Sequence, residues 1–319
     1  MPGAVGSPGG ERMPLVSFHQ LMDDAEQGGY AVGYFESWNL ESLQGVLDAA
    51  EEAASPVIVG FSGVNLPDPR RLLGERLPLY AALGRAACQT ARVPTALLFN
   101  ESPHLRWIER AVEQGFNLVM FADEHLGLDE LRLRVRQTVA LAAGRAAVEA
   151  EMAALPGVAN GLVELPKQLE LTDPDAAAEF VDQTGIDALA VSLGNVHLHG
   201  RLKVGLDLDR LRAIRQRVQV PLVLHGASSV DDEALRQAIR GGIRKVNVGS
   251  ALRRAFYEAV RERVRALNAD FNPYDVLGSG RANDILMAGR LAVRELVLQK
   301  MRLFGSAGRA PFDRPRPRH

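Results

Sequence analysis

Residues 187–229 read DALAVSLGNVHLHGRLKVGLDLDRLRAIRQRVQVPLVLHGASS, and this stretch decides the fold class. It contains an apolar run at 187–194, a segment with helical spacing of apolar residues at 207–218 and a second apolar run at 220–226. Continuous apolar runs, as opposed to alternating ones, are typical of strands that are buried on both faces of a parallel sheet. The stretch therefore predicts one strand–helix–strand unit of an α/β protein.

The same unit recurs along the rest of the chain. The predicted strands are residues 30–37, 56–61, 93–100, 117–122, 146–151, 187–194, 220–226 and 245–250. The clearest predicted helices are residues 40–53, 103–115, 129–144, 173–185 and 207–218. Eight evenly spaced units predict a single-domain (β/α)8 TIM barrel over residues 13–309. An open doubly wound sheet is the alternative, but no G-x-G-x-x-G turn follows the first strand.

Composition excludes several classes of protein. Among the 319 residues, 37 Lys and Arg stand against 39 Asp and Glu, so no positive excess is available to hold a nucleic acid. No apolar run reaches the ~18 residues of a membrane helix. A single cysteine, Cys88, cannot form an intramolecular disulfide. We expect a cytoplasmic protein that binds neither nucleic acid nor membrane, with disordered ends at residues 1–12 and 310–319.

Two histidines follow neighbouring predicted strands. In a barrel of this type, the residues at the carboxyl ends of the strands form the site. His197 and His225 would enter one mouth from adjacent strands, and Glu101 ends the third strand. Two histidines and one carboxylate suit zinc or another first-row divalent ion with an open coordination position. The alternative is that the histidines are ordinary hydrogen-bonded residues.

A run of small residues follows the seventh and eighth predicted strands. Such loops present backbone N–H groups and hydroxyls that bind phosphate, and this position is the usual phosphate site of the fold. The candidate phosphate-binding residues are Gly226, Ser228, Asn247, Gly249 and Ser250. A turn without a ligand is the alternative. Lys245, at the start of the eighth strand, is expected at the opposite face as a structural or solvated residue.

Two carboxylates share one side of the fifth predicted strand. Glu149 and Glu151 lie two residues apart, so their side chains point the same way. A carboxylate inside a barrel is costly unless it is paired or bound to a metal. Glu151, nearer the strand tip, is therefore a candidate for acid–base chemistry. The alternative is a carboxylate that pairs with Lys or Arg from a neighbouring layer.

These motifs carry a resemblance to a known family. They are GYAVGYF…NLE (29–41), AAEEAASPVIVG (49–60), VEAE (148–151), TDPDAAAEFVDQTGIDALAVSLGNVH (172–197), VPLVLHGASS (220–229), KVNVGSALR (245–253) and KMRLFGSAG (300–308). Through these motifs, the chain resembles the class II, metal-dependent fructose-bisphosphate and tagatose-bisphosphate aldolases. The resemblance runs from about Pro14 to Ala310 of this chain. The resemblance implies a zinc-dependent homodimer or homotetramer that cleaves ketose phosphates to dihydroxyacetone phosphate and an aldehyde.

The resemblance also implies roles for particular residues. It places His197 and His225 at two of the three zinc ligands, and Glu151 at a carboxylate near the metal. It places Gly226, Ser228, Asn247 and Ser250 at the contacts with the ketose phosphate. The third strand departs from the family pattern Leu-Asp-His-Gly, because it reads Phe99-Asn100-Glu101-Ser102. Asn100 thus stands at the position of the catalytic Asp, and Glu101 at that of the third zinc ligand.

A second departure removes another part of the family's proton relay. The mobile loop that carries Gly-Gly-x-Glu-Asp in the family reads PGVAN at 156–160, without the Glu. Glu36, Asp123 or Glu151 is then the candidate to transfer the proton. We expect a divergent, divalent-metal-dependent aldehyde-lyase that acts on a phosphorylated ketose. The alternatives are an inactive sugar-phosphate-binding protein and another metal-assisted carbonyl or enediolate reaction, such as isomerisation.

Overall fold

The computed structural model describes residues 14–152, 170–196 and 203–310. Eight parallel strands close into a barrel in the order β1 to β8, and β8 pairs with β1. The strands are β1 (Val32–Ser37), β2 (Val57–Ser62), β3 (Thr95–Ser102), β4 (Leu118–Phe121), β5 (Ala147–Glu151), β6 (Ala188–Ala190), β7 (Leu222–Leu224) and β8 (Ile243–Val248). The predicted TIM barrel is thereby confirmed.

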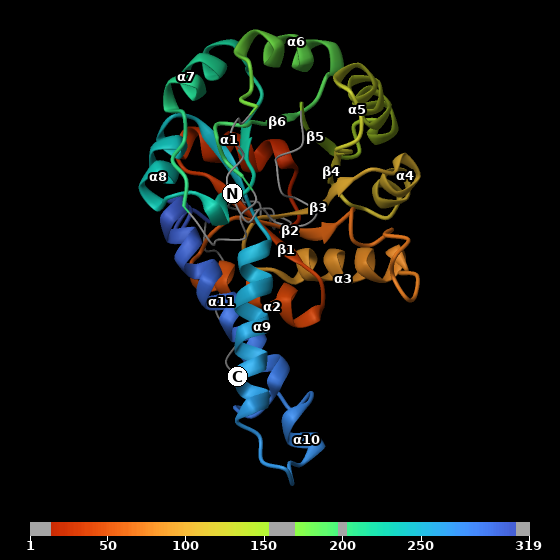
Figure 1. Cartoon of the computed structure of the whole chain (residues 1–319), viewed down its shortest axis with the longest axis vertical. Coiled ribbons are helices and arrows are strands. Elements are labelled where there is room, and N and C mark those ends of the chain that lie inside the picture. The colour runs from red at the N-terminus through yellow and green to blue at the C-terminus, as the bar shows by residue number, and fades with distance from the viewer. Residues whose placement is uncertain (1–13, 153–169, 197–202, 311–319) are drawn as a thin grey trace, which may run out of the picture.

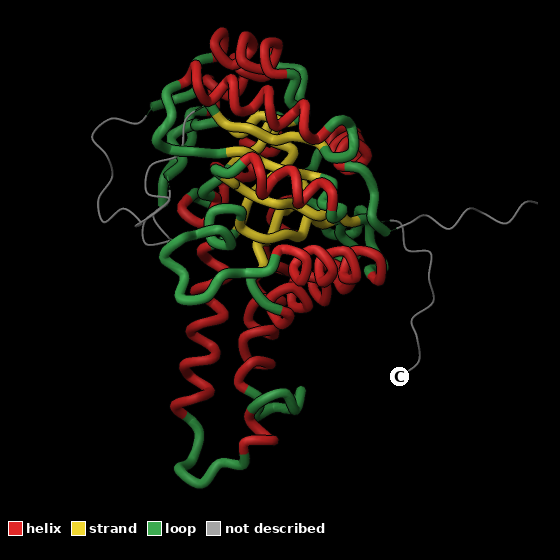
Figure 2. The backbone as a smooth tube through the Cα atoms, turned by 90° about the vertical axis from the view of Figure 1, so that its right-hand side faces the viewer, coloured by secondary structure: helices red, strands yellow, loops and turns green. Residues whose placement is uncertain are grey.

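Helices surround the barrel, as Figures 1 and 2 show. They are α1 (Phe18–Gly28), α2 (Leu40–Glu52), α3 (Leu77–Thr90), α4 (Leu105–Glu113), α5 (Leu128–Ala142), α6 (Pro174–Thr184), α7 (Leu208–Arg217), η1 (Ala227–Ser229), α8 (Asp232–Arg240), α9 (Ser250–Arg265), α10 (Pro273–Val276) and α11 (Ile285–Phe304). Each of the five predicted helices corresponds to one of them. No helix among the described residues is long and apolar enough to cross a membrane.

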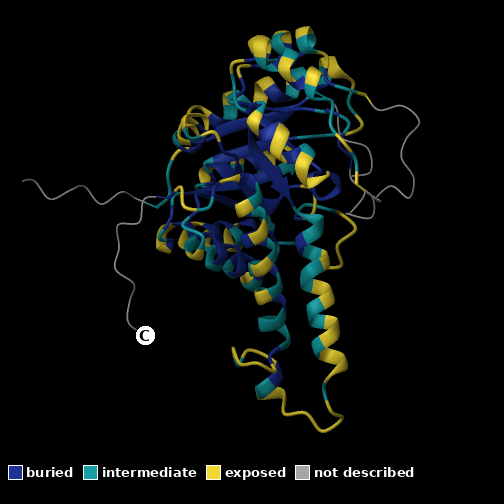
Figure 3. Ribbon diagram, turned by 90° about the vertical axis from the view of Figure 1, so that its left-hand side faces the viewer, coloured by how far each residue is buried: buried dark blue, intermediate teal, exposed yellow. Residues whose placement is uncertain are grey.

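The strands separate two apolar cores. Outward-facing side chains such as Phe35 and Leu97 pack under the surrounding helices. Inward-facing side chains such as Ile58 and Leu98 form a second cluster together with Phe18 and the rest of the apolar face of α1. Helix α1 therefore closes the amino-terminal end of the barrel, while the buried strands fill the centre of Figure 3.

Local signals set the ends of the elements. Asn39 and Ser42 form a capping box at the start of α2. Strands β6 and β7 are shorter than the apolar runs that predict them, because the chain turns away after each strand. The Asn195 side chain holds the turn after β6. It accepts from the Leu193 amide at 2.7 Å and donates to the His225 carbonyl, after β7, at 3.0 Å.

Helices α9 and α11 form an arm that extends from the barrel, with α10 at its far end (Figures 1 and 2). Arg290 of α11 holds the arm to α2 through bonds of 2.6 and 2.8 Å to the two carboxylate oxygens of Asp48. At the end of the described chain, the Ala310 amide donates to the Ala54 carbonyl at 2.8 Å. Residues 1–12 and 311–319, which belong to the ends expected to be disordered, lie outside the described residues.

Candidate active site at the carboxyl end of the barrel

Strand alternation directs polar side chains into the barrel mouth. The inward positions hold apolar residues such as Tyr34, Leu98 and Val223, all of the inner cluster. Because side chains alternate along a strand, the residue two places further on points to the same side. The inward polar positions that result are Glu36, Asn100, Glu149, Glu151, His225 and Asn247. The sequence therefore brings together these predicted site residues from five strands.

Glu101 reaches this mouth through an irregularity in β3. The register with β4 shifts between Phe99 and Ser102. Glu101 has a φ of 55°, in the left-handed region that non-glycine residues seldom adopt. A β-bulge can re-aim a side chain in this way, and strained residues of this kind cluster at functional sites. The carboxylate of Glu101 consequently lies 3.1 Å from His225 Nδ1.

His225 is held between two carboxylates. Its Nε2 lies 2.8 Å from Glu149 Oε1 and 2.9 Å from Asn247 Nδ2, and its Nδ1 faces Glu101. Burial lowers the pKa of His225, but hydrogen bonds and charge from Glu101 and Glu149 outweigh burial and raise that pKa to about 10. An ionised carboxylate can only accept, so the hydrogen on Nε2 belongs to the bond with Glu149.

Below His225, a buried ion pair joins β5 and β8. Lys245 Nζ lies 2.7 Å from Glu149 Oε2 and also donates to Asn247 Oδ1. Burial raises the pKa of Glu149, but the charges of Lys245 and His225 hold it below its usual value. The alternative interpretation of Glu149, as a carboxylate paired with a lysine, is confirmed.

The expected place of Lys245, at the opposite face or in solvent, is wrong. The side chain is fully buried inside the barrel, where Nζ also lies 5.2 Å from the centre of the Tyr34 ring. The register between β7 and β8 shifts between the pairs Leu222–Ile243 and Val223–Lys245. Lys245 lies two residues before Asn247, so alternation along β8 places both side chains inside the barrel.

The three candidate acid–base residues have different surroundings. Glu151 is buried at the end of β5, where desolvation and the charges of Glu101 and Glu149 raise its pKa to about 8 against the opposing charge of His225. Burial also raises the pKa of Glu36, and Arg253 partly offsets this effect. Asp123 lies in the loop after β4 and accepts a hydrogen bond from the His125 amide at 3.0 Å.

The predicted phosphate-binding residues lie after β7 and β8. Gly226 adopts a φ of 65°, and a Cβ at this position would meet the Val196 carbonyl oxygen at 2.9 Å. Ser228 lies in η1, and Ser250 begins α9 directly after Gly249. Gly226 therefore packs directly against the Val196 backbone, where a larger residue would not fit.

Sequence reasoning missed Lys203 at this loop. Its Nζ donates to the carbonyl oxygens of Ser228 at 3.0 Å and of Val230 at 3.3 Å. The ammonium group therefore stands beside the predicted phosphate loop, where its charge would attract an anion. The only sequence signal was a lysine in the segment between the sixth strand and the following helix.

Part of the predicted site lies outside the described residues, namely His197 and the loop at 156–160. Within the described ranges, no group of three or more His, Cys, Asp and Glu is arranged to hold a metal ion. Two of the three predicted metal ligands, Glu101 and His225, nevertheless lie together.

The Glu101–His225 contact fits a divalent cation. With Nε2–H committed to Glu149, a neutral His225 would present the lone pair of Nδ1 to Glu101 Oε1 at 3.1 Å. Two acceptor atoms this close require a cation between them, either a proton or a metal ion. The ligand atoms of a tetrahedral zinc ion with bonds of about 2.0–2.1 Å are about 3.3 Å apart. The donated Nε2–H is also the usual outer contact of a metal-binding histidine.

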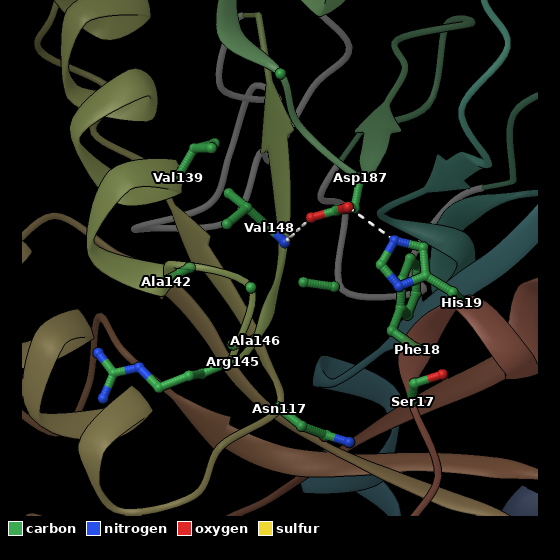
Figure 4. A pocket seen from close by; sticks show the side chains of 13 residues that line it. Ser17, Phe18, His19, Asn117, Val139, Ala142, Arg145, Ala146, Val148 and Asp187 are labelled. Atoms are coloured by element: carbon green, nitrogen blue, oxygen red, sulfur yellow. Dashed lines mark hydrogen bonds and ion pairs between the residues drawn. The ribbon is translucent and has the colours of Figure 1, made fainter.

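A separate cavity lies at the amino-terminal end of the strands (Figure 4). It has a volume of about 230 Å³ and lies between α1 and the starts of β5 and β6. Asp187 bridges its sides, since its carboxylate lies 2.8 Å from His19 Nε2 and accepts from the Val148 amide at 2.7 Å. None of the predicted site residues lines this cavity.

Comparisons with known proteins identify the family. A family model described as "Fructose-bisphosphate aldolase class-II" matches residues 16–309. The chain belongs to this family. A fructose-bisphosphate aldolase of Geobacillus stearothermophilus is 34% identical to this class II aldolase over 299 residues, which cover 93% of this chain and 99% of the relative. The fructose-bisphosphate aldolase of Thermus caldophilus is 33% identical over 323 residues, covering 93% and 100%.

Solved structures agree with this assignment. The crystal structure of the YdjI aldolase from Escherichia coli K12 matches this class II aldolase with a TM-score of 0.75 and 31% sequence identity. The match covers 93% of this chain and 100% of that one. Relatives near one-third identity share the fold and ancestry, whereas the chemistry of a site depends on its own residues.

Proposed function

We propose that this class II aldolase is a divalent-metal-dependent aldehyde-lyase. It would cleave a phosphorylated ketose reversibly to dihydroxyacetone phosphate, or a similar phosphorylated ketone, and an aldehyde. The observation that carries the proposal is the position of His225, held between Glu101 and Glu149 at the carboxyl ends of the strands. A histidine whose second nitrogen is fixed by a buried carboxylate is arranged to bind a metal ion.

The ligands proposed for the metal, which we expect to be zinc, are His197, His225 through Nδ1, and Glu101. When bound, the ion would polarise the ketone carbonyl of the substrate. Glu149 accepts the hydrogen on His225 Nε2 and so leaves Nδ1 as the free ligand atom. Glu101 brings a negative charge where the family carries a neutral histidine, so a weaker polarisation is expected than in the family pattern.

The phosphate of the substrate is assigned to the loops after β7 and β8. Backbone N–H groups at Gly226, Gly249 and Ser250, with the Ser228 hydroxyl, are suited to its oxygens. Lys203 adds a positive charge beside Ser228. Asn247, tied to Lys245 and close to His225, would orient the substrate between the phosphate loops and the metal.

Glu151 is the proposed acid–base residue. Its pKa of about 8 lets the carboxyl hold or release a proton near neutral pH. Glu36 and Asp123 are the remaining candidates, but Glu36 is already bound to Arg253 and Asp123 accepts from a backbone amide. Asn100 cannot exchange a proton. Its buried Oδ1 has no hydrogen-bond partner among the described residues, so it is suited to accept from a substrate hydroxyl.

We place the protein in the cytoplasm as a homodimer or homotetramer, with no nucleic acid or membrane partner. The arm of α9, α10 and α11 supports self-association, because it exposes large apolar side chains such as Tyr257, Phe271 and Tyr274. Exposed apolar surface of this kind often marks an interface between proteins.

The test combines metal content with product release. About one divalent ion per chain is expected in the purified protein, with loss of metal in His225→Ala and Glu101→Ala. His19→Ala, a histidine at the opposite end of the barrel, is the matched control and should retain its metal. The metal-loaded protein should release an aldehyde from a ketose phosphate. A protein that stays metal-free in added zinc, manganese or cobalt contradicts the proposal.

One observation favours a second function, a sugar-phosphate-binding protein without catalysis. Asn100 replaces the catalytic Asp of the family pattern while the phosphate loops keep their glycines and serine. Binding of ketose phosphates that yields neither an aldehyde nor an isomerised product would support this function instead.

A further inference from the structure

The hydroxyl group of Tyr34 lies inside the barrel among apolar side chains. Tyr34 belongs to the inner apolar cluster and is 1% exposed. Its Oη has no hydrogen-bond partner among the described residues. A buried polar atom without a partner destabilises a folded protein, and a phenylalanine would fill the same space without such an atom. The hydroxyl group therefore calls for a partner that the described part of the chain does not supply.

The layers of the barrel place Tyr34 directly beneath the candidate site. In a (β/α)8 barrel, alternate strands contribute four side chains to each interior layer, and the strand tilt shifts a layer by about two residues from one odd-numbered strand to the next. Tyr34 is in register with Ile58, which is in register with Ala96. Leu98, two residues further along β3, therefore shares a layer with Tyr34. The same steps around the barrel give one layer of Tyr34, Leu98, Glu149 and Val223, and above it a layer of Glu36, Asn100, Glu151 and His225. Tyr34 is thus part of the floor of the mouth.

Packing explains the Tyr34 ring but not its hydroxyl group. The ammonium nitrogen of Lys245 lies 5.2 Å from the centre of the ring, a contact that a phenylalanine could also make. The aromatic ring therefore fits the interior of the barrel with or without the oxygen.

The hydroxyl group is a hydrogen-bond donor near neutral pH. Burial raises the pKa of Tyr34 well above its ordinary value, and the charge of Glu36 adds to this effect. Glu101 and Glu149 raise the pKa further, whereas Arg253 opposes them. The proton consequently stays on Oη, and the carboxylates of the mouth lie close enough to act on it.

Other donors around the floor are already engaged. His225 Nε2 and Lys245 Nζ contact the two oxygens of Glu149. Arg253 donates to Glu36. Of these donors and Tyr34, only Tyr34 has no acceptor in the described chain. A substrate oxygen that reaches the floor would therefore find its hydrogen-bond donor in Tyr34.

We propose that the Tyr34 hydroxyl donates a hydrogen bond to an oxygen of the substrate, in the phosphorylated ketone half that reaches the floor of the mouth. The inference rests on the proposed function, since it names a further residue of the same site. The ketone half is assigned because its carbonyl would bind next to His225, in the layer above Tyr34. Tyr34 transfers no proton, so its role is separate from that of Glu151.

The test uses Tyr34→Phe in the full-length, zinc-loaded protein and has two readouts. The first is the melting temperature, which should stay equal or rise, because the substitution removes an unpaired buried oxygen. The second is the dissociation constant for dihydroxyacetone phosphate, measured by calorimetry. We expect this constant to rise about tenfold, because the substrate oxygen loses its donor. A purely structural hydroxyl would give the opposite pair of results.

Tyr30→Phe is the matched control, because Tyr30 is a buried tyrosine of the same inner cluster that precedes β1. Its dissociation constant should equal that of the wild type. An unchanged constant in Tyr34→Phe, or a lower melting temperature whatever the constant, would overturn the inference and leave the proposed lyase intact.

The remaining outcomes separate this inference from the proposed function. Weaker binding in Tyr34→Phe, in a protein that cleaves no ketose phosphate, would support the inference and contradict the lyase. A wild-type protein that does not bind dihydroxyacetone phosphate would overturn the inference. The lyase would then be contradicted as well only if no ketose phosphate is cleaved.

Discussion

The ammonium nitrogen of Lys245 lies 2.7 Å from Glu149 Oε2, and both side chains are fully buried inside the barrel. Glu149 uses its other oxygen to accept from His225. One carboxylate thus connects the interior of the barrel to the candidate metal ligand above it. Because the pair is shielded from water, neither charge can be removed without affecting the other.

Replacing Lys245 with Met should strongly destabilise the protein. The substitution leaves Glu149 as a buried carboxylate without its cation, which costs about 3–5 kcal/mol of unfolding free energy. Urea unfolding measures this loss. The double variant Lys245→Met/Glu149→Gln should recover part of it, because no unpaired charge remains. A loss below about 1 kcal/mol in the single variant, the level of an exposed pair, would show that the pair is not buried as described.

Replacing Glu149 with Gln should weaken the binding of metal. The change removes the charge that fixes His225 through Nε2, and the loss of such an outer partner lowers metal affinity about 10–100-fold. Competition with a chromogenic chelator gives the affinity. Glu26→Gln, on the outside of the barrel next to Arg244, serves as the control and should bind metal like the wild type. Equal affinities in both variants would remove Glu149 from this role.

Glu151 should make the metal-free protein less stable as the pH rises. Its pKa is raised from 4.5 to about 8 in the folded state, so the folded protein holds a proton that the unfolded chain releases in this range. The free energy of unfolding therefore falls from pH 4.5 to pH 8 and loses no more from this group above that value. Denaturant unfolding across this window should show a shallower slope in Glu151→Gln, and an identical slope would contradict the raised pKa.

Cys88 should be unreactive in the folded protein. The thiol is fully buried, and burial raises its pKa to about 12. Because the thiolate is the reactive form, iodoacetamide should label Cys88 only after unfolding. Mass spectrometry before and after denaturation measures this labelling. Rapid modification of the native protein would show that the packing between α3 and the barrel opens readily.

The fold could be predicted because its signals are local. Continuous apolar runs at regular spacing, such as 56–61 and 117–122, correspond to β2 and β4 within two residues at each end. The predicted strands at 187–194 and 220–226 are longer than β6 and β7, since the apolar residues continue into turns such as the one held by Asn195. Composition alone does not show where an apolar segment leaves a sheet.

The site could be predicted only in part, because its contacts join distant parts of the chain. Alternation gave Glu149 and Glu151 a common side, and the position of His225 after the seventh strand brought it to the same interior, where it contacts Glu149. The partners Lys245 and Arg253 were not anticipated. The Lys245–Glu149 pair depends on how β8 and β5 face each other inside the barrel, and the Arg253–Glu36 pair on how α9 leaves the barrel beside β1. Neither property has a signature in a single sequence without an alignment.

Helix α1 closes the barrel at the end opposite to the mouth, and the inner apolar cluster continues from Phe18 up to Met120. The apolar residues of this inner cluster are therefore separate from the polar residues of the mouth, and Glu149 joins the two. Evolution can exchange residues at the mouth, such as Glu36, while the lower barrel maintains the folded state. A scaffold divided in this way has room to acquire new substrates through few substitutions, and each intermediate sequence can still fold.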